Sequence, residues 1–160
     1  MNKRRLLGFI AKAHRNTYAA QKETRARHKC KVPILAGHKD YEFKEGDWLY
    51  HDSYAGSLCA PGREVVFFKG IPVWCMSYQG QPNPKQEAPF FQEQLFPFLR
   101  RALMNFDDSV PFRGPKEFSE GDFKYTFEIK GDCNYFKGRE QVLYKNERVF
   151  FQDVMGSLIK

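Results

Sequence analysis

Hydrophobic residues recur at helical spacing in two stretches of this 160-residue chain. Leu6 and Ile10 belong to an apolar stripe that predicts a helix over about residues 4–20. A comparable stripe predicts a second helix over about residues 89–105. Pro97 interrupts the second stripe, so that helix is either kinked at the proline or begins there.

Each predicted helix is followed by three short runs rich in aromatic and β-branched residues, which favour strands. Lys69-Gly70 and Lys145-Asn146 separate the second and third runs, where a tight hairpin needs residues that tolerate positive φ. Residues 25–40 are expected to form a loop, and residues 81–89, with three prolines, a connector. The six predicted strands cover residues 48–54, 64–68, 71–78, 123–129, 140–144 and 148–154.

The two sets of strands are similar in sequence. Glu42 to Trp48 (EFKEGDW) recurs as Glu117 to Phe123 (EFSEGDF), 75 residues later. After a one-residue insertion, Gly-Arg-Glu at 62–64 recurs at 138–140. Order, register and turn residues are kept together over about forty positions, which chance similarity rarely achieves, so the pattern indicates an internal repeat.

The sequence therefore predicts an α+β fold built from a duplicated αβββ module, with internal repeats over about residues 41–80 and 116–156. Short hairpins pair neighbouring strands antiparallel, so we expect one antiparallel sheet of about six strands with both helices on one face. Two three-stranded sheets packed as separate lobes are the alternative. At this length, residues 1–160 are expected to form a single domain.

Composition favours a cytoplasmic protein with neither membrane span nor cofactor. The apolar runs are far shorter than the ~20 residues that cross a bilayer. Lys12 to Arg15 end the N-terminal apolar stretch too early for a signal peptide. The four cysteines show no CxxC spacing. His28, Cys30 and His38 match no usual zinc site, so no metal is expected.

Positive charge is concentrated near the N-terminus. Residues 1–31 hold ten of the 26 Lys and Arg residues and one acid, Glu23, whereas the rest of the chain is close to neutral. Such a segment could contact nucleic-acid phosphates. A solvated helix face and loop is the favoured interpretation, so nucleic acid is a possible but not a favoured partner.

The first strands of the two sets differ in charge at one inward position. In the second half, alternation places only apolar or aromatic residues on the buried face of this strand, Phe127 among them. In the first half Asp52 takes the matching position, between Tyr50 and Tyr54. A buried carboxylate costs several kcal/mol unless it is hydrogen-bonded, paired, protonated or beside a cavity. Asp52 is therefore either a structural residue or part of a functional site.

Aromatic and polar side chains are expected to gather around this aspartate. The tyrosines and the tryptophan of the first half can wall an apolar pocket while offering hydroxyl or indole donors. Arg113, in the loop Pro-Phe-Arg-Gly-Pro, could bind an anion or pair with the aspartate. The predicted ligand-binding residues are Asp52, Tyr50, Tyr54, Trp74, Tyr78 and Arg113.

Local motifs do not support a known catalytic mechanism. His51 and Asp52 are adjacent on a strand and face opposite sides, so they cannot act together in a triad with Ser53. The sequence holds no GxSxG, HExxH or P-loop motif. Arg-Glu occurs at 63–64 and again at 139–140, and we favour salt bridges or arginine stacking on aromatic rings over ligand binding for both pairs.

Six short motifs are distributed along the chain: EGDW at 45–48, HDSYAG at 51–56, GREVV at 62–66, PVW at 72–74, PFRGP at 111–115 and EGD at 120–122. Through these motifs the chain resembles an uncharacterised bacterial domain family over most of residues 5–156. The motifs carry no assigned chemistry. Some members resemble the C-terminal part of helix-turn-helix transcriptional regulators, which implies a sensor-like role.

Three functions remain open. The favoured one is a small-molecule-binding, sensor-like domain with an aromatic pocket around Asp52. The second is an enzyme that uses Asp52 as a general acid or base with a raised pKa. The third is an adaptor that binds nucleic acid or an acidic partner through the basic residues of segment 3–31. The sequence alone specifies neither a ligand nor an oligomeric state.

Overall fold

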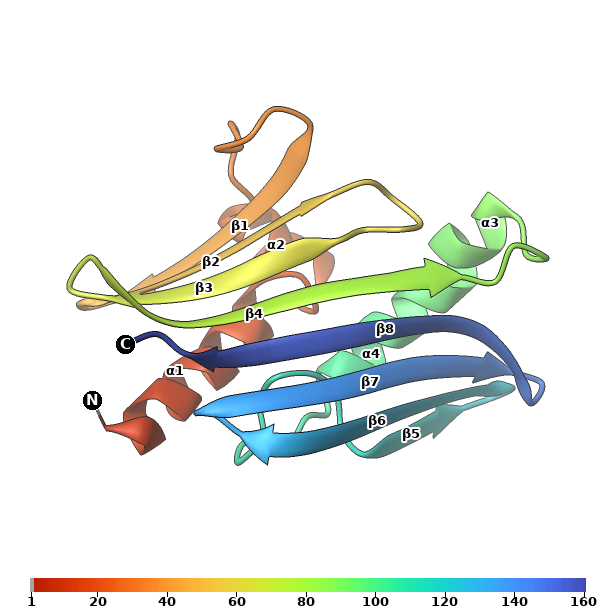
Figure 1. The fold of residues 1–160 in the computed structure, drawn as a ribbon. Coiled ribbons are helices and arrows are strands. Elements are labelled where there is room, and N and C mark those ends of the chain that lie inside the picture. Colours follow the sequence, from red (N-terminus) through yellow and green to blue (C-terminus); the bar gives the residue numbers. More distant parts are fainter. Residues whose placement is uncertain (1) are drawn as a thin grey trace.

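One antiparallel sheet of eight strands forms the centre of the protein (Figure 1). The computed structural model describes residues 2–160. The strand order is β1-β2-β3-β4-β8-β7-β6-β5, so two four-stranded meanders meet where β4 pairs with β8. The strands are β1 (His38–Glu45), β2 (Trp48–Ala55), β3 (Gly62–Phe68), β4 (Ile71–Pro82), β5 (Glu117–Glu120), β6 (Phe123–Asp132), β7 (Tyr135–Tyr144) and β8 (Glu147–Leu158).

Two longer helical segments cover the same face of this sheet (Figure 1). The helical elements are α1 (Lys3–Asn16), α2 (Lys22–His28), α3 (Ala88–Phe90), the π-helical turn η1 (Phe91–Leu95) and α4 (Phe96–Leu103). The last three form one continuous segment. Its wide turn, closed by the Phe96 N–H donating to the Phe91 carbonyl, lies directly before Pro97, which has no N–H to donate. No helix within residues 2–160 has the length and apolar character that a membrane crossing requires.

The α+β class and the antiparallel pairing are confirmed, but the predicted number of six strands is wrong. The two additional strands, β1 and β5, are the outermost ones and pair with β2 and β6. Both are rich in charged residues, and Phe118 is the only large apolar residue in β5. Charged residues are typical of edge strands, which have only one neighbour, and they hide the alternation that marks a strand in sequence.

The hairpin turns and α2 show which local signals the sequence carries. Lys69 (φ 53°), Lys145 (φ 50°) and Asn146 (φ 64°) adopt the left-handed conformation expected at the two tight hairpins. Helix α2 lies partly within the predicted loop over residues 25–40, and it has no buried residue. A helix without an apolar stripe leaves no periodic signal in the sequence, so α2 was not predicted.

The hydrophobic core lies between the helices and the inner face of the sheet. Leu6 and Ile10 of α1 are fully buried, as are Phe98 and Ala102 of α4. These side chains pack in one cluster with the inward residues of the strands, including Trp74 of β4. The candidate site lies in this same space between the helices and the sheet.

Candidate functional site

A cavity of about 340 Å³ opens between strands β2–β4 and helices α1 and α4. Its volume is at the lower end of the range of about 300–1,000 Å³ that small-molecule sites span. Leu99 of α4 and Phe112 of the following loop contribute to its apolar wall, whereas Asp52 and Glu64 contribute carboxyl groups from the strands. Apolar walls that carry a few placed polar groups are typical of ligand sites.

The structure brings five of the six predicted ligand-binding residues to this cavity. These are Asp52, Tyr50, Tyr54, Tyr78 and Arg113. Trp74 is fully buried outside the lining and stacks on Phe112 and Phe136, with ring centroids 5.7 and 6.3 Å away. Trp74 and Tyr78 do share the inward face of β4, but four residues of strand separate them by about 13 Å.

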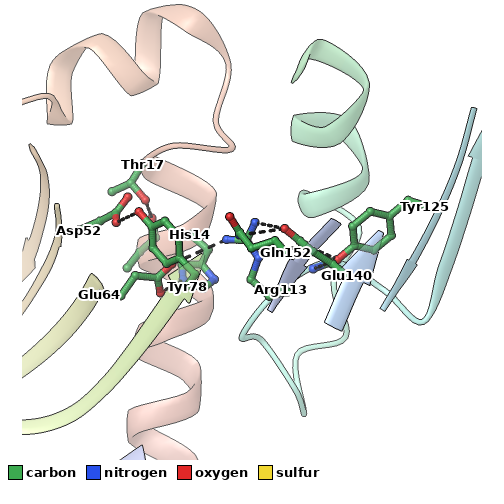
Figure 2. Close-up of polar contacts among 11 residues, drawn as sticks. His14, Thr17, Asp52, Glu64, Tyr78, Arg113, Tyr125, Glu140 and Gln152 are labelled. Atoms are coloured by element: carbon green, nitrogen blue, oxygen red, sulfur yellow. Dashed lines mark hydrogen bonds and ion pairs between the residues drawn. The ribbon is translucent and has the colours of Figure 1, made fainter. Parts of the chain in front are cut away.

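Asp52 points inward from β2 and is 3% exposed. The Tyr78 hydroxyl donates a hydrogen bond to its Oδ1 over 2.6 Å (Figure 2). Burial, and next the negative charge of Glu64, raise the pKa of Asp52 to about 8, although the Tyr78 hydrogen bond and Arg113 act in the opposite direction. At neutral pH the Asp52 carboxyl is therefore mostly protonated.

Glu64 lies directly opposite Asp52, on β3. Its side chain is 4% exposed, and its Oε2 is 2.8 Å from Nε2 of His14, a residue of α1 (Figure 2). Arg113 Nη1 approaches Glu64 Oε1 to 4.0 Å. The two carboxyl groups thus form one buried acidic centre, which α1 covers through His14.

Arg113 is bound mainly by the second half of the chain. Its Nε and Nη2 donate to the two carboxylate oxygens of Glu140 over 3.0 and 2.6 Å (Figure 2). Tyr125 and Gln152 also donate to Glu140, over 2.8 and 3.0 Å. Burial lowers the pKa of Arg113, but the negative charge of Glu140 more than offsets this, so the net shift is upward. The ion-pair partner of Arg113 is therefore Glu140 rather than Asp52.

The two inward glutamates were not predicted as site residues. In each Arg-Glu pair the arginine is exposed and the glutamate, Glu64 or Glu140, is buried. Arg139 pairs with Asp153 on the outer face over 2.6 and 2.7 Å. A signal was present, because Glu64 is two residues before the buried Val66 and so shares its face.

His51 and Ser53 lie on the face of the sheet opposite Asp52, as strand alternation predicts, and there they contact Asp40 of β1. His51 Nε2 is 3.1 Å from Asp40 Oδ2, and the Ser53 hydroxyl donates to Oδ1 over 2.8 Å. The Ile34 N–H also donates to Oδ2, over 2.9 Å. Burial opposes ionisation of Asp40, but these hydrogen bonds lower its pKa below the ordinary value. Asp40 thus anchors the loop between α2 and β1.

The basic residues of segment 3–31 lie mostly on exposed surfaces of α1 and α2. Lys12 pairs with Glu45, and Arg15 pairs with Asp108. Both pairs are solvent-exposed and contribute little to stability. Nowhere in the described part of the chain do three or more His, Cys, Asp or Glu side chains gather in a way that could hold a metal ion.

The fold and its cavity define an α+β domain in which two helical segments cover one face of an eight-stranded antiparallel sheet. Residues 52–159, more than half of the chain, match the family DUF5680, a domain of unknown function, and the chain belongs to this family. No curated protein and no solved structure matches the chain.

Proposed function

We propose that this domain binds a small molecule in the cavity beside Asp52 and serves as a sensor-like module. The observation that carries the proposal is the pair of buried carboxyl groups, Asp52 and Glu64, on the wall of a largely apolar cavity. Buried charged groups add little net stability compared with apolar residues of similar volume. A few polar groups on an apolar wall are, in contrast, what orients a ligand.

An internal duplication, which we propose on the basis of the sequence repeat, supports the same interpretation. At the matching positions of the second half, Phe127 and Val154 replace Asp52 and Tyr78. One half therefore holds a hydrogen-bonded polar pair where the other holds an apolar pair. Because the second half folds with an apolar pair at these positions, folding does not require the polar pair. Polar residues at positions that can be apolar are expected at functional sites.

Thermal-shift screening against a broad metabolite library tests the proposal. A ligand present at 100 times its Kd stabilises the folded state by about 2.7 kcal/mol. We expect at least one stabiliser of the wild-type protein. Its effect is lost in Leu99→Phe, which fills the cavity, and is kept in Trp74→Phe, which alters a buried aromatic residue outside the lining. An absence of stabilisers, or equal shifts in Leu99→Phe, would contradict the proposal.

A second candidate function is an enzyme that uses Asp52 as its general acid. A carboxyl that faces a cavity with a pKa of about 8 is well placed for proton transfer at neutral pH. Each compound that binds is incubated with the protein and followed by mass spectrometry. If this function is right, the compound is converted, and Asp52→Asn stops the conversion at compound concentrations that still saturate the variant. Binding without any conversion leaves the sensor function alone.

A further inference from the structure

Three oxygen atoms face the cavity with unused hydrogen-bonding capacity. The Tyr78 hydroxyl donates a hydrogen bond to Oδ1 of Asp52, whereas Oδ2 has no hydrogen-bond partner within residues 2–160. Oε1 of Glu64 has only the distant Arg113, at 4.0 Å. Tyr50 is 1% exposed and lines the cavity, and its hydroxyl likewise forms no hydrogen bond to any described residue. Such groups lose hydrogen bonds on burial unless a bound molecule replaces them.

Buried carboxyl groups outnumber basic groups around these oxygen atoms. The buried carboxyl groups are those of Asp52, Glu64 and Glu140, whereas Arg113 and His14 are the basic groups packed against them. Arg113 is already engaged by Glu140 at two points, and His14 by Glu64. If all three carboxyl groups were ionised and His14 were protonated, one negative charge would lack a counter-charge, which is costly in a buried site. Without a bound cation Asp52 avoids this cost by keeping its proton, and a bound ammonium group would take the place of that proton.

The other two basic residues that line the cavity, Lys39 and Arg100, interact with groups outside the acidic centre. Lys39 donates to the Gly56 carbonyl over 3.1 Å and lies over the ring of Tyr54 at 5.5 Å. Arg100, on α4, interacts with Tyr18: burial raises the pKa of Tyr18, and the positive charge of this arginine opposes that rise only in part. Neither contact supplies a counter-charge to the acidic centre.

We propose that the ligand carries a protonated primary amine, which binds between Asp52, Glu64 and Tyr50, on an aromatic or branched aliphatic body that fills the apolar part of the cavity. This inference rests on the small-molecule function proposed above. An ammonium group has three donors, and the site offers three acceptors with free capacity once Asp52 has given up its proton. The tyrosine rings of the wall add cation–π attraction for the same charge.

Isothermal titration with matched probes tests the charge of the ligand. 2-Phenylethylamine and 2-phenylethanol have nearly the same shape and differ in the terminal group, and 3-phenylpropanoate carries the opposite charge. 3-Methylbutylamine and 3-methylbutanol repeat the comparison with an aliphatic body. We expect each amine to bind at least about tenfold more tightly than its alcohol, which corresponds to about 1.4 kcal/mol. The carboxylate is expected not to bind.

Isosteric variants locate the effect. Asp52→Asn and Glu64→Gln keep the shape of the side chains but remove their charges, so each should weaken amine binding about tenfold and leave the alcohols nearly unchanged. Asp153→Asn removes a carboxylate from the opposite face of the sheet and should change neither. Circular dichroism confirms that each variant is folded before it is titrated.

The outcomes separate the two proposals. If the alcohols or the carboxylate bind as well as the amines, or if the library yields only neutral or anionic stabilisers, the amine inference is wrong and the cavity remains a binding site. If neither the library nor the probe set binds, the small-molecule function fails and the amine inference fails with it. Amine binding that survives both isosteric variants also overturns the inference, because the ammonium would then lie elsewhere.

Discussion

One aromatic ring lies over each of two glycines that occupy corresponding positions in the proposed repeat, but the ring comes from a different strand in each half. A Cβ on Gly62 would lie 2.5 Å from the ring carbon Cζ of Tyr78, on β4. A Cβ on Gly138 would lie 2.6 Å from Cε2 of Phe127, on β6. Asp52, which aligns with Phe127, is small enough to leave this space to Tyr78. The two positions should therefore be strongly coupled.

The double variant Asp52→Phe/Tyr78→Val transfers the apolar pair of the second half to the first. Asp52→Phe alone adds a second ring to the same space, and overpacking of this kind costs about 1–3 kcal/mol. Tyr78→Val alone leaves the buried carboxyl without its donor and opens a void, at a cost of about 3–5 kcal/mol. Together the substitutions supply one ring and remove the buried polar pair. We expect the double variant to be within about 1 kcal/mol of wild type or more stable, with a coupling energy of about 3 kcal/mol or more.

Urea unfolding of the wild type, both single variants and the double variant gives the four free energies of this cycle. Far-UV circular dichroism and tryptophan fluorescence should report the same midpoints, since the cycle requires two-state unfolding. If the single-variant losses add to within about 0.5 kcal/mol, the two side chains do not compete for one space, and the reasoning from the glycines is refuted.

Three further predictions follow from the buried groups. Glu140→Gln leaves the guanidinium of Arg113 without its two-point partner, so urea unfolding should show a loss of about 3–5 kcal/mol. The pKa of Asp52 is about 8 in the folded state, far above its unfolded value, so between about pH 4 and 8 only the folded state keeps this proton. The free energy of unfolding should therefore fall as pH rises through this range, by at most about 1.4 kcal/mol per pH unit. The variant Asp52→Asn should flatten this pH dependence. The pKa of Asp40 is lowered in the folded state, so the pH effect is opposite: its contribution to stability is present at neutral pH and is lost as pH falls through the folded pKa. The variant Asp40→Asn should also speed hydrogen exchange at the Ile34 amide, which donates to this carboxylate.

Each of these predictions has a contrary result. A loss below about 1 kcal/mol in Glu140→Gln would mean that solvent reaches the guanidinium and stabilises its charge. Stability that is flat between pH 5 and 8 in the wild type would mean that the Asp52 carboxyl is ionised in the folded state. Unchanged exchange at Ile34 in Asp40→Asn would show that the loop is held by other contacts.

Features of this structure that depend on residues close together in the chain could be predicted from the sequence. Strand alternation placed Asp52 on the inner face, and the positive-φ residues marked both hairpins, because each depends on neighbours within a few positions. The outermost strands could not be recognised in this way, since a charged edge strand resembles a loop until a neighbouring strand pairs with it.

The contacts of the site depend on tertiary structure. His14 reaches Glu64 across 50 residues, and Arg113 reaches Glu140 across 27. No short-range pattern specifies either distance. The sequence placed Arg113 in a rigid loop but could not indicate which carboxylate that loop would meet. Likewise, Trp74 and Tyr78 share one face of a strand, but Trp74 stacks on Phe112 and Phe136 and does not line the cavity.

Arg113 lies on the segment that joins the two halves of the chain and is near a carboxylate from each of them. It is 2.6 Å from Oε1 of Glu140 and 4.0 Å from Oε1 of Glu64. Electrostatic attraction strengthens at short range, so the arginine is held chiefly by β7 while still responding to the charge on β3. Any event that neutralises Glu64 weakens the smaller attraction and leaves the guanidinium wholly to Glu140. Through this arginine, the charge of one carboxylate in the first half influences the ion pair in the second.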